Sequence, residues 1–186
     1  MLRFRDLRSI HGGDENLNRR LEFVNVSSAD KAEAEFLKCC GSRNWVHAMT
    51  DARPFENVDD LLAKADSLWW SLSKEDWLEA FRSHPKIGEK KAATAQSEQA
   101  QKWSAQEQAG TQEAAAETKA DLPEGNRRYE DRFGFIFIIC ASGRSAEEML
   151  ASLNNRLQND AETELVVAAE EQRKITRLRL EKLVKE

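Results

Sequence analysis

A helical repeat of apolar residues is the feature that most limits what this chain can fold into. Between positions 58 and 69, apolar side chains recur at the i, i+3, i+4 and i+7 spacing that places them on one face of an α-helix. Asn57 precedes this repeat and is a favoured N-cap residue. A similar stripe follows Asp160 and runs to about Leu183, which predicts a last and longest helix. Each of these helices is expected to bury one face.

Further helix starts and stops divide the rest of the chain. Ser27-Ser28 can cap a helix from Ala29 to Cys40, which Gly41 is placed to terminate. Ser73 begins another helix, and Ser145 opens one with the Ser-x-x-Glu pattern of a capping box.

The composition also favours a helical fold. The 186 residues include only eight glycines and three prolines, and 33% of them are charged, a balance that favours helices over a turn-rich β sandwich. The length suits one domain with a single sizeable core. We therefore predict an all-α, single-domain, multi-helix bundle over residues 26–186. Residues 1–25 show no sustained periodicity and are predicted to be an N-terminal extension of unknown role.

Charge, cysteines and hydropathy exclude several classes of partner. The net charge of −5 and the interspersed basic residues argue against nucleic acid, which needs a basic face. Three cysteines without a CxxC spacing predict neither a disulfide framework nor a zinc site, and the three histidines lack a ligand spacing such as HExxH. No apolar run is long enough to span a bilayer, and the N-terminus is too charged for a signal peptide. We expect a cytoplasmic protein with no metal, membrane or nucleic-acid partner.

His84 lies where a helix must stop and a loop must open. Pro85 disfavours the α region for the residue before it and lacks a backbone N–H, so the preceding helix is expected to end at or just before His84. Ile87 and the permissive Gly88 carry the chain onward and leave the imidazole able to point into a cleft. A histidine at a helix end can equally cap carbonyl groups. The stretch alone leaves a structural and a chemical role open.

A second candidate segment follows the polar stretch from Glu89 to Lys102, which is typical of a solvated loop or a weakly held helix. Ser104 and Glu107 have the spacing of a capping box, with Trp103 as its staple residue. The start of a helix also collects free backbone N–H groups, which suit an anionic ligand. Capping and ligand binding are compatible roles here.

Residues 135–141 form a short continuous apolar run. Leu122-Pro123 is expected to open the helix before it, and Gly134 to end that helix. The run is rich in β-branched and aromatic residues and would be a buried strand in a β protein. With no evident sheet partner, its backbone groups need other partners, and a polar ligand could supply some of them. The alternatives are an extended wall of a ligand site and a buried helix turn.

Arg179 interrupts the C-terminal apolar stripe. It stands between Leu178 and Leu180, where the pattern otherwise offers apolar side chains to the core. Its guanidinium either snorkels outward or lies at the edge of a cleft to bind a carboxylate.

Taken together, four motifs resemble the 2-oxo-4-hydroxy-4-carboxy-5-ureidoimidazoline (OHCU) decarboxylases of urate catabolism. The resemblance covers roughly residues 26–185. It is carried, in order, by His84-Pro85 with Ile87-Gly88, Trp103-Ser104-x-x-Glu107-Gln108-x-Gly110, Tyr129-x-x-x-Phe133-Gly134-Phe135-x-Phe137 and Ile175-x-x-Leu178-Arg179-Leu180. It implies an all-α domain, often a homodimer, that uses no cofactor and converts OHCU to (S)-allantoin with loss of carbon dioxide.

The resemblance also implies which residues form the site. His84 matches the family's catalytic histidine, and Pro85 beside it matches a substrate contact. Glu107 matches the carboxylate that faces the histidine, and Arg179 matches an arginine near the substrate's charged groups; both are also implied to bind substrate. The other implied substrate contacts are Ser104, Ala105, Gln106, Gln108, Phe137, Ile138, Ile139, Cys140 and Ala141.

The implied chemistry needs a positioned acid. Loss of carbon dioxide leaves an electron pair on a ring carbon, which must be protonated from one face to give one enantiomer. With an ordinary pKa near 6.5, His84 is expected to exchange a proton at neutral pH, while Glu107 orients the imidazole or binds the substrate. The alternative is a non-enzymatic helical interaction module, or an inactive member of the same fold. That alternative predicts that His84, Glu107 and Arg179 do not converge.

Overall fold

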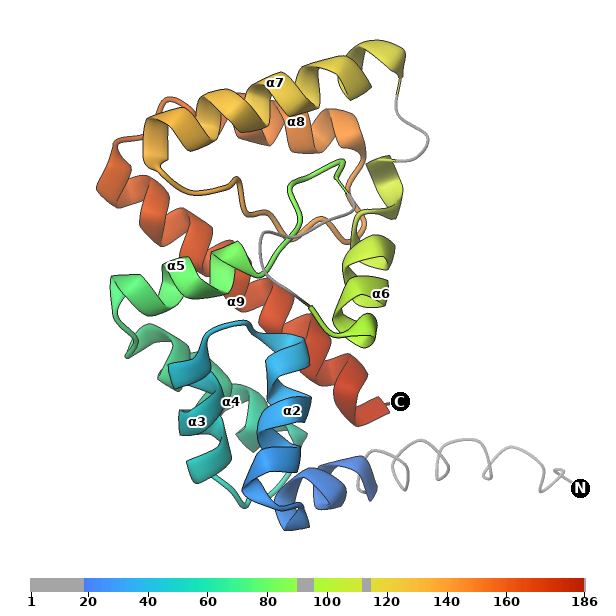
Figure 1. Ribbon diagram of the computed structural model, residues 1–186, viewed down its shortest axis with the longest axis vertical. Helices are drawn as coiled ribbons and strands as arrows, with labels where there is room; N and C mark the ends of the chain where they lie inside the picture. The colour runs from blue at the N-terminus through green and yellow to red at the C-terminus, as the bar shows by residue number, and fades with distance from the viewer. Residues whose placement is uncertain (1–18, 90–95, 112–114, 186) are drawn as a thin grey trace, which may run out of the picture.

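The structure, a computed structural model, describes residues 19–89, 96–111 and 115–185. Within these ranges the chain forms α-helices and no β-strand, which confirms the predicted all-α fold. Residues 19–26 form a first helical segment, and a short 3-10 turn, Ala109–Thr111, follows α6. The helices labelled in Figure 1 are α2 (Ala29–Cys39), α3 (Arg43–Asp51), α4 (Val58–Trp70), α5 (Lys74–Arg82), α6 (Glu98–Glu107), α7 (Ala116–Phe133), α8 (Ala146–Arg156) and α9 (Ala161–Lys185).

The C-terminal helix α9 crosses the middle of the molecule and connects its two ends (Figure 1). At one end α2 and α4 pack against it, and α3 packs against both of them. At the other end α7 and α8 lie side by side. Helix α5 also packs on α9, so the chain leaves α5 in the region between the two ends. No helix in the described part of the chain is long and apolar enough to cross a membrane.

Two clusters of buried apolar side chains take the place of the single core that the chain length predicts. The larger cluster includes Trp45 and Trp69 and lies among α2, α3, α4, α5 and α9. The smaller cluster includes Met149 and Leu153 and lies around α7 and α8. The apolar residues that α9 contributes all belong to the larger cluster, whereas the smaller one is built from α7, α8 and residues 87, 137, 139 and 141.

The described part of the expected N-terminal extension packs on the larger cluster. Leu21 and Val24 are both buried there. They stand three residues apart in the helical segment 19–26, so they share one face of it. Residues 1–18 lie outside the described residues.

Local capping signals set several helix boundaries where the sequence predicts them. The Asn57 side chain accepts a hydrogen bond from the Asp60 N–H (2.9 Å) at the start of α4. Ser145 and Glu148 form the predicted capping box of α8. Gly134 ends α7 with a φ of 78°, the left-handed conformation that glycine adopts without a Cβ clash.

Helix α6 starts earlier than the sequence analysis predicts. Its N-cap is Ser97, whose side chain accepts a hydrogen bond from the Ala100 N–H (3.2 Å). Ser104 and Glu107 therefore lie in the last turns of the helix and form no capping box. The Ala-, Gln- and Glu-rich residues before Ser104 are good helix formers, so the helix begins at the earlier cap. Residues 90–95 of the polar stretch lie outside the described residues.

Helix α7 also starts earlier, at Ala116, and runs through Pro123. A proline inside a helix costs one backbone hydrogen bond and crowds the preceding turn. Leu122 is buried in the smaller cluster, and α7 packs along α8. Packing of this face outweighs the local penalty at Pro123.

Gly41 does not cap α2 as predicted, because the helix ends at Cys39 and its C-cap Cys40 is already extended. A Cβ atom at position 41 would lie 2.3 Å from the Ser83 Cβ, well inside contact distance. The missing side chain lets the loop between α2 and α3 pass against the residue that precedes His84.

Candidate active site

His84 is held in a buried turn directly after α5. Its N–H donates to the Phe81 carbonyl (3.0 Å), so the turn stays tight up to Pro85. The residue is 7% exposed, and its imidazole Nε2 has no hydrogen-bond partner among the described residues. Because an unpaired buried polar atom is costly, this nitrogen is a candidate contact for a ligand atom.

The surroundings keep the His84 imidazole neutral. Burial and the nearby positive charge of Arg179 lower the pKa of His84 to about 3, and the neighbouring Gln172 side chain opposes this shift. The imidazole is therefore uncharged at neutral pH. The ordinary histidine pKa near 6.5 therefore does not carry over to His84, because neither the burial nor the approach of Arg179 is visible in the local sequence.

Ser104 and Glu107 face α9 and bind Arg179. The Glu107 carboxylate accepts hydrogen bonds from the Arg179 Nε (2.9 Å) and Nη2 (2.7 Å), and the Ser104 Oγ accepts one from Nη2 (3.0 Å). Their i, i+3 spacing places both side chains on one face of α6. The spacing that predicts a capping box thus serves to bind a guanidinium 72 positions away from Glu107.

Arg179 does not snorkel, since it is only 2% exposed. It binds a carboxylate, as the second alternative predicts, but that carboxylate belongs to Glu107 of the same chain. The Lys182 Nζ lies 3.8 Å from the Glu107 Oε1 and adds a weaker contact. Removing one partner of the buried pair would leave an uncompensated charge, so the two residues depend on each other.

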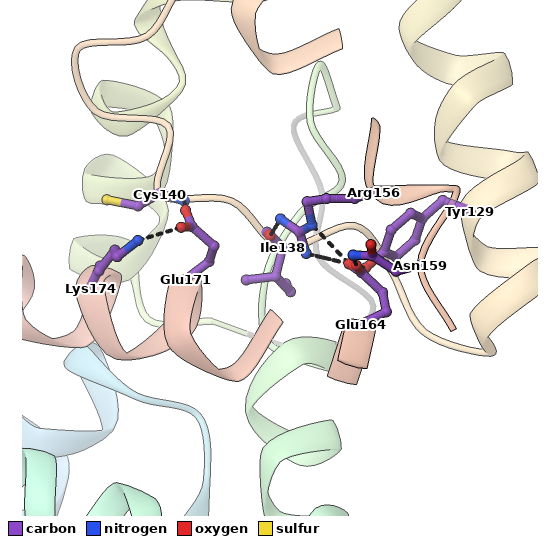
Figure 2. A network of polar contacts seen from close by, with 8 residues as sticks. All are labelled: Tyr129, Ile138, Cys140, Arg156, Asn159, Glu164, Glu171 and Lys174. Atoms are coloured by element: carbon purple, nitrogen blue, oxygen red, sulfur yellow. Dashed lines mark hydrogen bonds and ion pairs between the residues drawn. The ribbon is translucent and has the colours of Figure 1, made fainter. Parts of the chain in front are cut away.

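Residues 136–141 form neither helix nor strand and follow an extended path between the two ends of the molecule (Figure 1). The extended alternative for this run is therefore correct. Charged side chains bind two of its backbone groups (Figure 2). The Ile138 carbonyl accepts a hydrogen bond from the Arg156 Nη1 (2.8 Å), and the Cys140 N–H donates to the Glu171 Oε2 (2.8 Å).

These elements border a small cavity of about 20 Å³, which has room for about one water molecule. Its floor and walls come from the turn after α5, the end of α6, the extended segment and α9. The lining residues are His84, Pro85, Ile87, Ser104, Glu107, Gln108, Phe137, Ile138, Ile139, Ala141 and Ile175.

Most of the predicted site residues meet at this cavity, and a few do not. Ala105 and Gln106 are exposed, because they lie on the face of α6 that points away from α9. Cys140 belongs to the extended segment but does not line the cavity.

Arg179 holds two lining residues, Ser104 and Glu107, without lining the cavity itself. Glu107 pairs with Arg179, and no hydrogen bond joins it to His84 among the described residues.

Sequence reasoning missed the polar residues that support this arrangement. Arg156 and Glu164 form a buried ion pair (Nη2 to Oε1, 2.6 Å), and Glu171 is also buried. The available signal was a set of polar residues at inward-facing positions of α9, including Gln172, which is fully buried. Their partners lie on other elements, so spacing alone could not pair them.

The fold and the site define an all-α protein with a small cavity that is lined by both polar and apolar residues. An imidazole, a carboxylate paired with a guanidinium, and an extended backbone surround it, which suits a small polar molecule better than a macromolecule. No group of three or more His, Cys, Asp or Glu side chains in the described ranges is placed to hold a metal ion.

A family profile described as OHCU decarboxylase matches residues 25–181. The Arabidopsis thaliana "Uric acid degradation bifunctional protein TTL" is 38% identical over 151 residues, which are 81% of this chain and 47% of that protein. The Amia calva 2-oxo-4-hydroxy-4-carboxy-5-ureidoimidazoline decarboxylase is 35% identical over 141 residues, which are 74% of this chain and 78% of that protein. A crystal structure of OHCU decarboxylase in the presence of (S)-allantoin has 37% identity and a TM-score of 0.71, covering 82% of this chain and 99% of that one.

The chain therefore belongs to the OHCU decarboxylase family. It spans less than half the length of the bifunctional uric acid degradation proteins that it matches.

Proposed function

We propose that this chain decarboxylates OHCU to (S)-allantoin in urate degradation. The observation that carries the proposal is that His84 and Glu107 line one cavity, with Arg179 bound to Glu107, although they come from three separate elements. The names of the relatives, and the (S)-allantoin present with the similar crystal structure, support the same substrate class.

In the proposed reaction the bond between the ring carbon and the carboxylate breaks, and carbon dioxide leaves. The electron pair left on the ring delocalises into the adjacent ring system, and a proton added from one face forms the new C–H bond. We assign this proton to His84. A neutral imidazole is a poor acid, so His84 must first be protonated, and the negative charge of a substrate carboxylate beside it raises its pKa toward neutrality.

Glu107 and Arg179 act together in this proposal. Three hydrogen bonds to Glu107 and Ser104 fix the guanidinium behind these two lining residues, and its remaining N–H groups can donate to the substrate's carboxylate once the lining side chains shift. The Glu107 oxygens can accept hydrogen bonds from the hydroxyl and ureido groups. Because the cavity has room for about one water molecule, substrate binding requires its lining side chains to shift.

The activity is tested with freshly made OHCU, by following the circular dichroism of the allantoin that forms. We expect the (S) enantiomer at a rate proportional to protein concentration, above the spontaneous decay of OHCU. Allantoin formed at the spontaneous rate without handedness would overturn the proposal.

The role of His84 is tested in the same assay with His84→Asn, which keeps a polar side chain but removes the titrating group. We expect turnover to fall by about two to four orders of magnitude, the usual contribution of a positioned acid or base. Far-ultraviolet circular dichroism should show that the variant is folded. A folded variant that keeps nearly the parental rate would remove His84 from the mechanism.

We also propose that residues 26–186 act as the functional domain, in the cytoplasm, as a homodimer and without a cofactor. The family resemblance supports the domain, the homodimer and the absence of a cofactor, and the three cysteines without a disulfide pattern support the cytoplasm. Light scattering during gel filtration should give about twice the mass of one chain. Activity that survives dialysis against a metal chelator would support the absence of a metal cofactor.

A further inference from the structure

We propose that Glu171 and Arg156 are positioning residues for the reaction, because they bind backbone groups on one side of the extended segment and so aim those of Ile139, on the other side, at the substrate. This inference rests on the proposed function. It concerns two residues that do not line the cavity and reach it only through residues 136–141. Figure 2 shows both side chains reaching that segment, Arg156 from α8 and Glu171 from α9.

The side chains of the segment alternate between the two apolar clusters, as an extended backbone requires. The members of the smaller cluster are Phe137, Ile139 and Ala141. Those in or against the larger cluster are Ile136, Ile138 and Cys140. In such a backbone the N–H and C=O groups of successive residues also point to alternate sides. The even-numbered residues therefore present their backbone groups to one side and the odd-numbered residues to the other.

Both bonded backbone groups belong to even-numbered residues. Arg156 holds the Ile138 carbonyl, and Glu171 holds the Cys140 N–H, each at 2.8 Å. Hydrogen bonds to charged groups are stronger than those between neutral groups, so two of them fix the rotation of this short segment about its own axis.

Arg156 is itself held in place by a buried network. Its Nε and Nη2 donate to the Glu164 Oε1 at 2.8 and 2.6 Å, and Glu164 is completely buried. The Tyr129 hydroxyl and the Asn159 side-chain amide also donate to Glu164. Burial raises the pKa of Tyr129, so its hydroxyl keeps the proton that it donates. The guanidinium therefore has little freedom to move away from the Ile138 carbonyl.

Glu171 uses its two carboxylate oxygens for two partners. Oε2 accepts from the Cys140 N–H, and Oε1 pairs with the Lys174 Nζ at 2.6 Å, one turn further along α9. Glu171 is buried, whereas Lys174 is partly exposed. The carboxylate thus links the extended segment to α9, the helix that also carries Arg179.

Ile139 lies between the two bonded residues, so their hydrogen bonds also fix the orientation of its backbone groups. Ile139 lines the cavity together with His84, and its backbone N–H and C=O make no hydrogen bond within the described ranges. Buried backbone groups need partners, and a ligand in the cavity can supply them. An N–H fixed in this position can bind an oxygen on which negative charge develops, and so set which ring face meets the proton donor.

The test compares Glu171→Met, which removes the acceptor, with Glu171→Gln, which keeps an oxygen acceptor in the same place. We expect kcat of Glu171→Met to fall by about ten- to a hundred-fold, the effect of a small misplacement of reacting groups. We also expect its allantoin to contain less of the (S) enantiomer, after the spontaneous product is subtracted by varying protein concentration. Glu171→Gln should recover most of both values.

Glu170→Met is the matched control, since Glu170 is the same residue type on the same helix and pairs with Arg173 instead (2.8 Å). We expect it to keep the parental kcat and product handedness. The handedness readout separates positioning from folding, because a smaller folded fraction lowers the rate without changing the enantiomer that the folded protein makes.

The proposal is overturned if folded Glu171→Met gives only (S)-allantoin at the parental kcat, or if Glu171→Gln is as impaired as Glu171→Met. If Glu171→Met does not fold, Glu171→Asp replaces it, because Asp keeps the charge near Lys174 but withdraws the acceptor. Parental kcat and product handedness in Glu171→Asp would also overturn the proposal. If the parent protein itself forms no (S)-allantoin, the proposed function fails instead, so the two failures are distinguishable.

Discussion

The burial of His84 makes the stability of the protein depend on pH. In the unfolded chain this imidazole takes up a proton below about pH 6.5, whereas in the folded protein its pKa is about 3. Between these values the unfolded state binds more protons. The stability contributed by a neutral His84 is therefore complete above about pH 6.5 and is lost as the pH falls toward 3.

This predicts a difference between the parent and His84→Asn on acidification. Between pH 7 and pH 5 the free energy of unfolding of the parent should fall by about 2 kcal/mol more than that of the variant, which lacks the titrating group. Urea unfolding at the two pH values measures this difference, and all other titrating groups act equally on both proteins. Equal losses would show that the buried imidazole titrates normally.

Arg179 and Glu107 give a second prediction at the residue scale. Arg179→Met leaves the mostly buried Glu107 carboxylate without its main partner, so we expect the protein to lose roughly 3 to 5 kcal/mol of stability. Adding Glu107→Leu should restore most of that stability, because an apolar pair of similar volume can replace a buried ion pair. Neither protein should decarboxylate OHCU at more than a small fraction of the parental rate.

Chemical denaturation of the single and double variants measures this coupling. Arg177→Met is the control, since Arg177 lies on the same helix but is partly exposed and pairs with Asp66 at 3.4 Å. Its effect should stay below about 1 kcal/mol. If Arg179→Met were as stable as Arg177→Met, the buried pair would not be the reason for the conformation of Arg179.

At the scale of elements, the close approach of the loop between α2 and α3 to the end of α5 predicts the effect of Gly41→Ala. The new Cβ meets the Ser83 Cβ at 2.3 Å, and overpacking of this kind costs about 1 to 3 kcal/mol. Because Ser83 immediately precedes His84, we expect kcat to fall together with the melting temperature.

The double variant Gly41→Ala/Ser83→Gly checks the cause. Removing the Ser83 side chain creates the space that the new methyl group needs, so stability and kcat should both recover relative to Gly41→Ala. Thermal unfolding and the OHCU assay give the two values. A double variant that is worse than Gly41→Ala would exclude the contact with Ser83 as the source of the effect.

At the scale of the whole molecule, the extended segment contributes side chains to both apolar clusters, so we expect the two clusters to unfold together. The chain offers a reporter for each cluster, because Trp45, Trp69 and Trp103 are buried in the larger one and Tyr129, the only tyrosine, in the smaller. Tryptophan fluorescence and NMR of fluorotyrosine-labelled protein should give the same urea midpoint. Separate midpoints would show that the two clusters are independent folding units.

Much of the fold could be predicted because helix boundaries depend on residues a few positions apart. The caps at Asn57 and Ser145 and the stop at Gly134 involve contacts within one or two turns. The same reasoning failed at α6, since Ser97 and Ser104 both offer a cap and local sequence does not say which is used. It also failed at Pro123, where packing of α7 against α8 outweighed a local penalty.

The candidate site, like the fold, could be predicted from the sequence only in part. The sequence by itself determined the helix content, the corner at His84, the apolar run after Gly134 and, through the order of its motifs, the family, whereas the structure decided that this run is extended. Only the tertiary structure decided that Glu107 pairs with Arg179 rather than with a helix start, that His84 is neutral, and that Arg156 and Glu171 hold the extended segment. The physical reason is that burial and charge pairing join residues far apart in the chain, 72 positions in the case of Glu107 and Arg179, and no local spacing records such a partner.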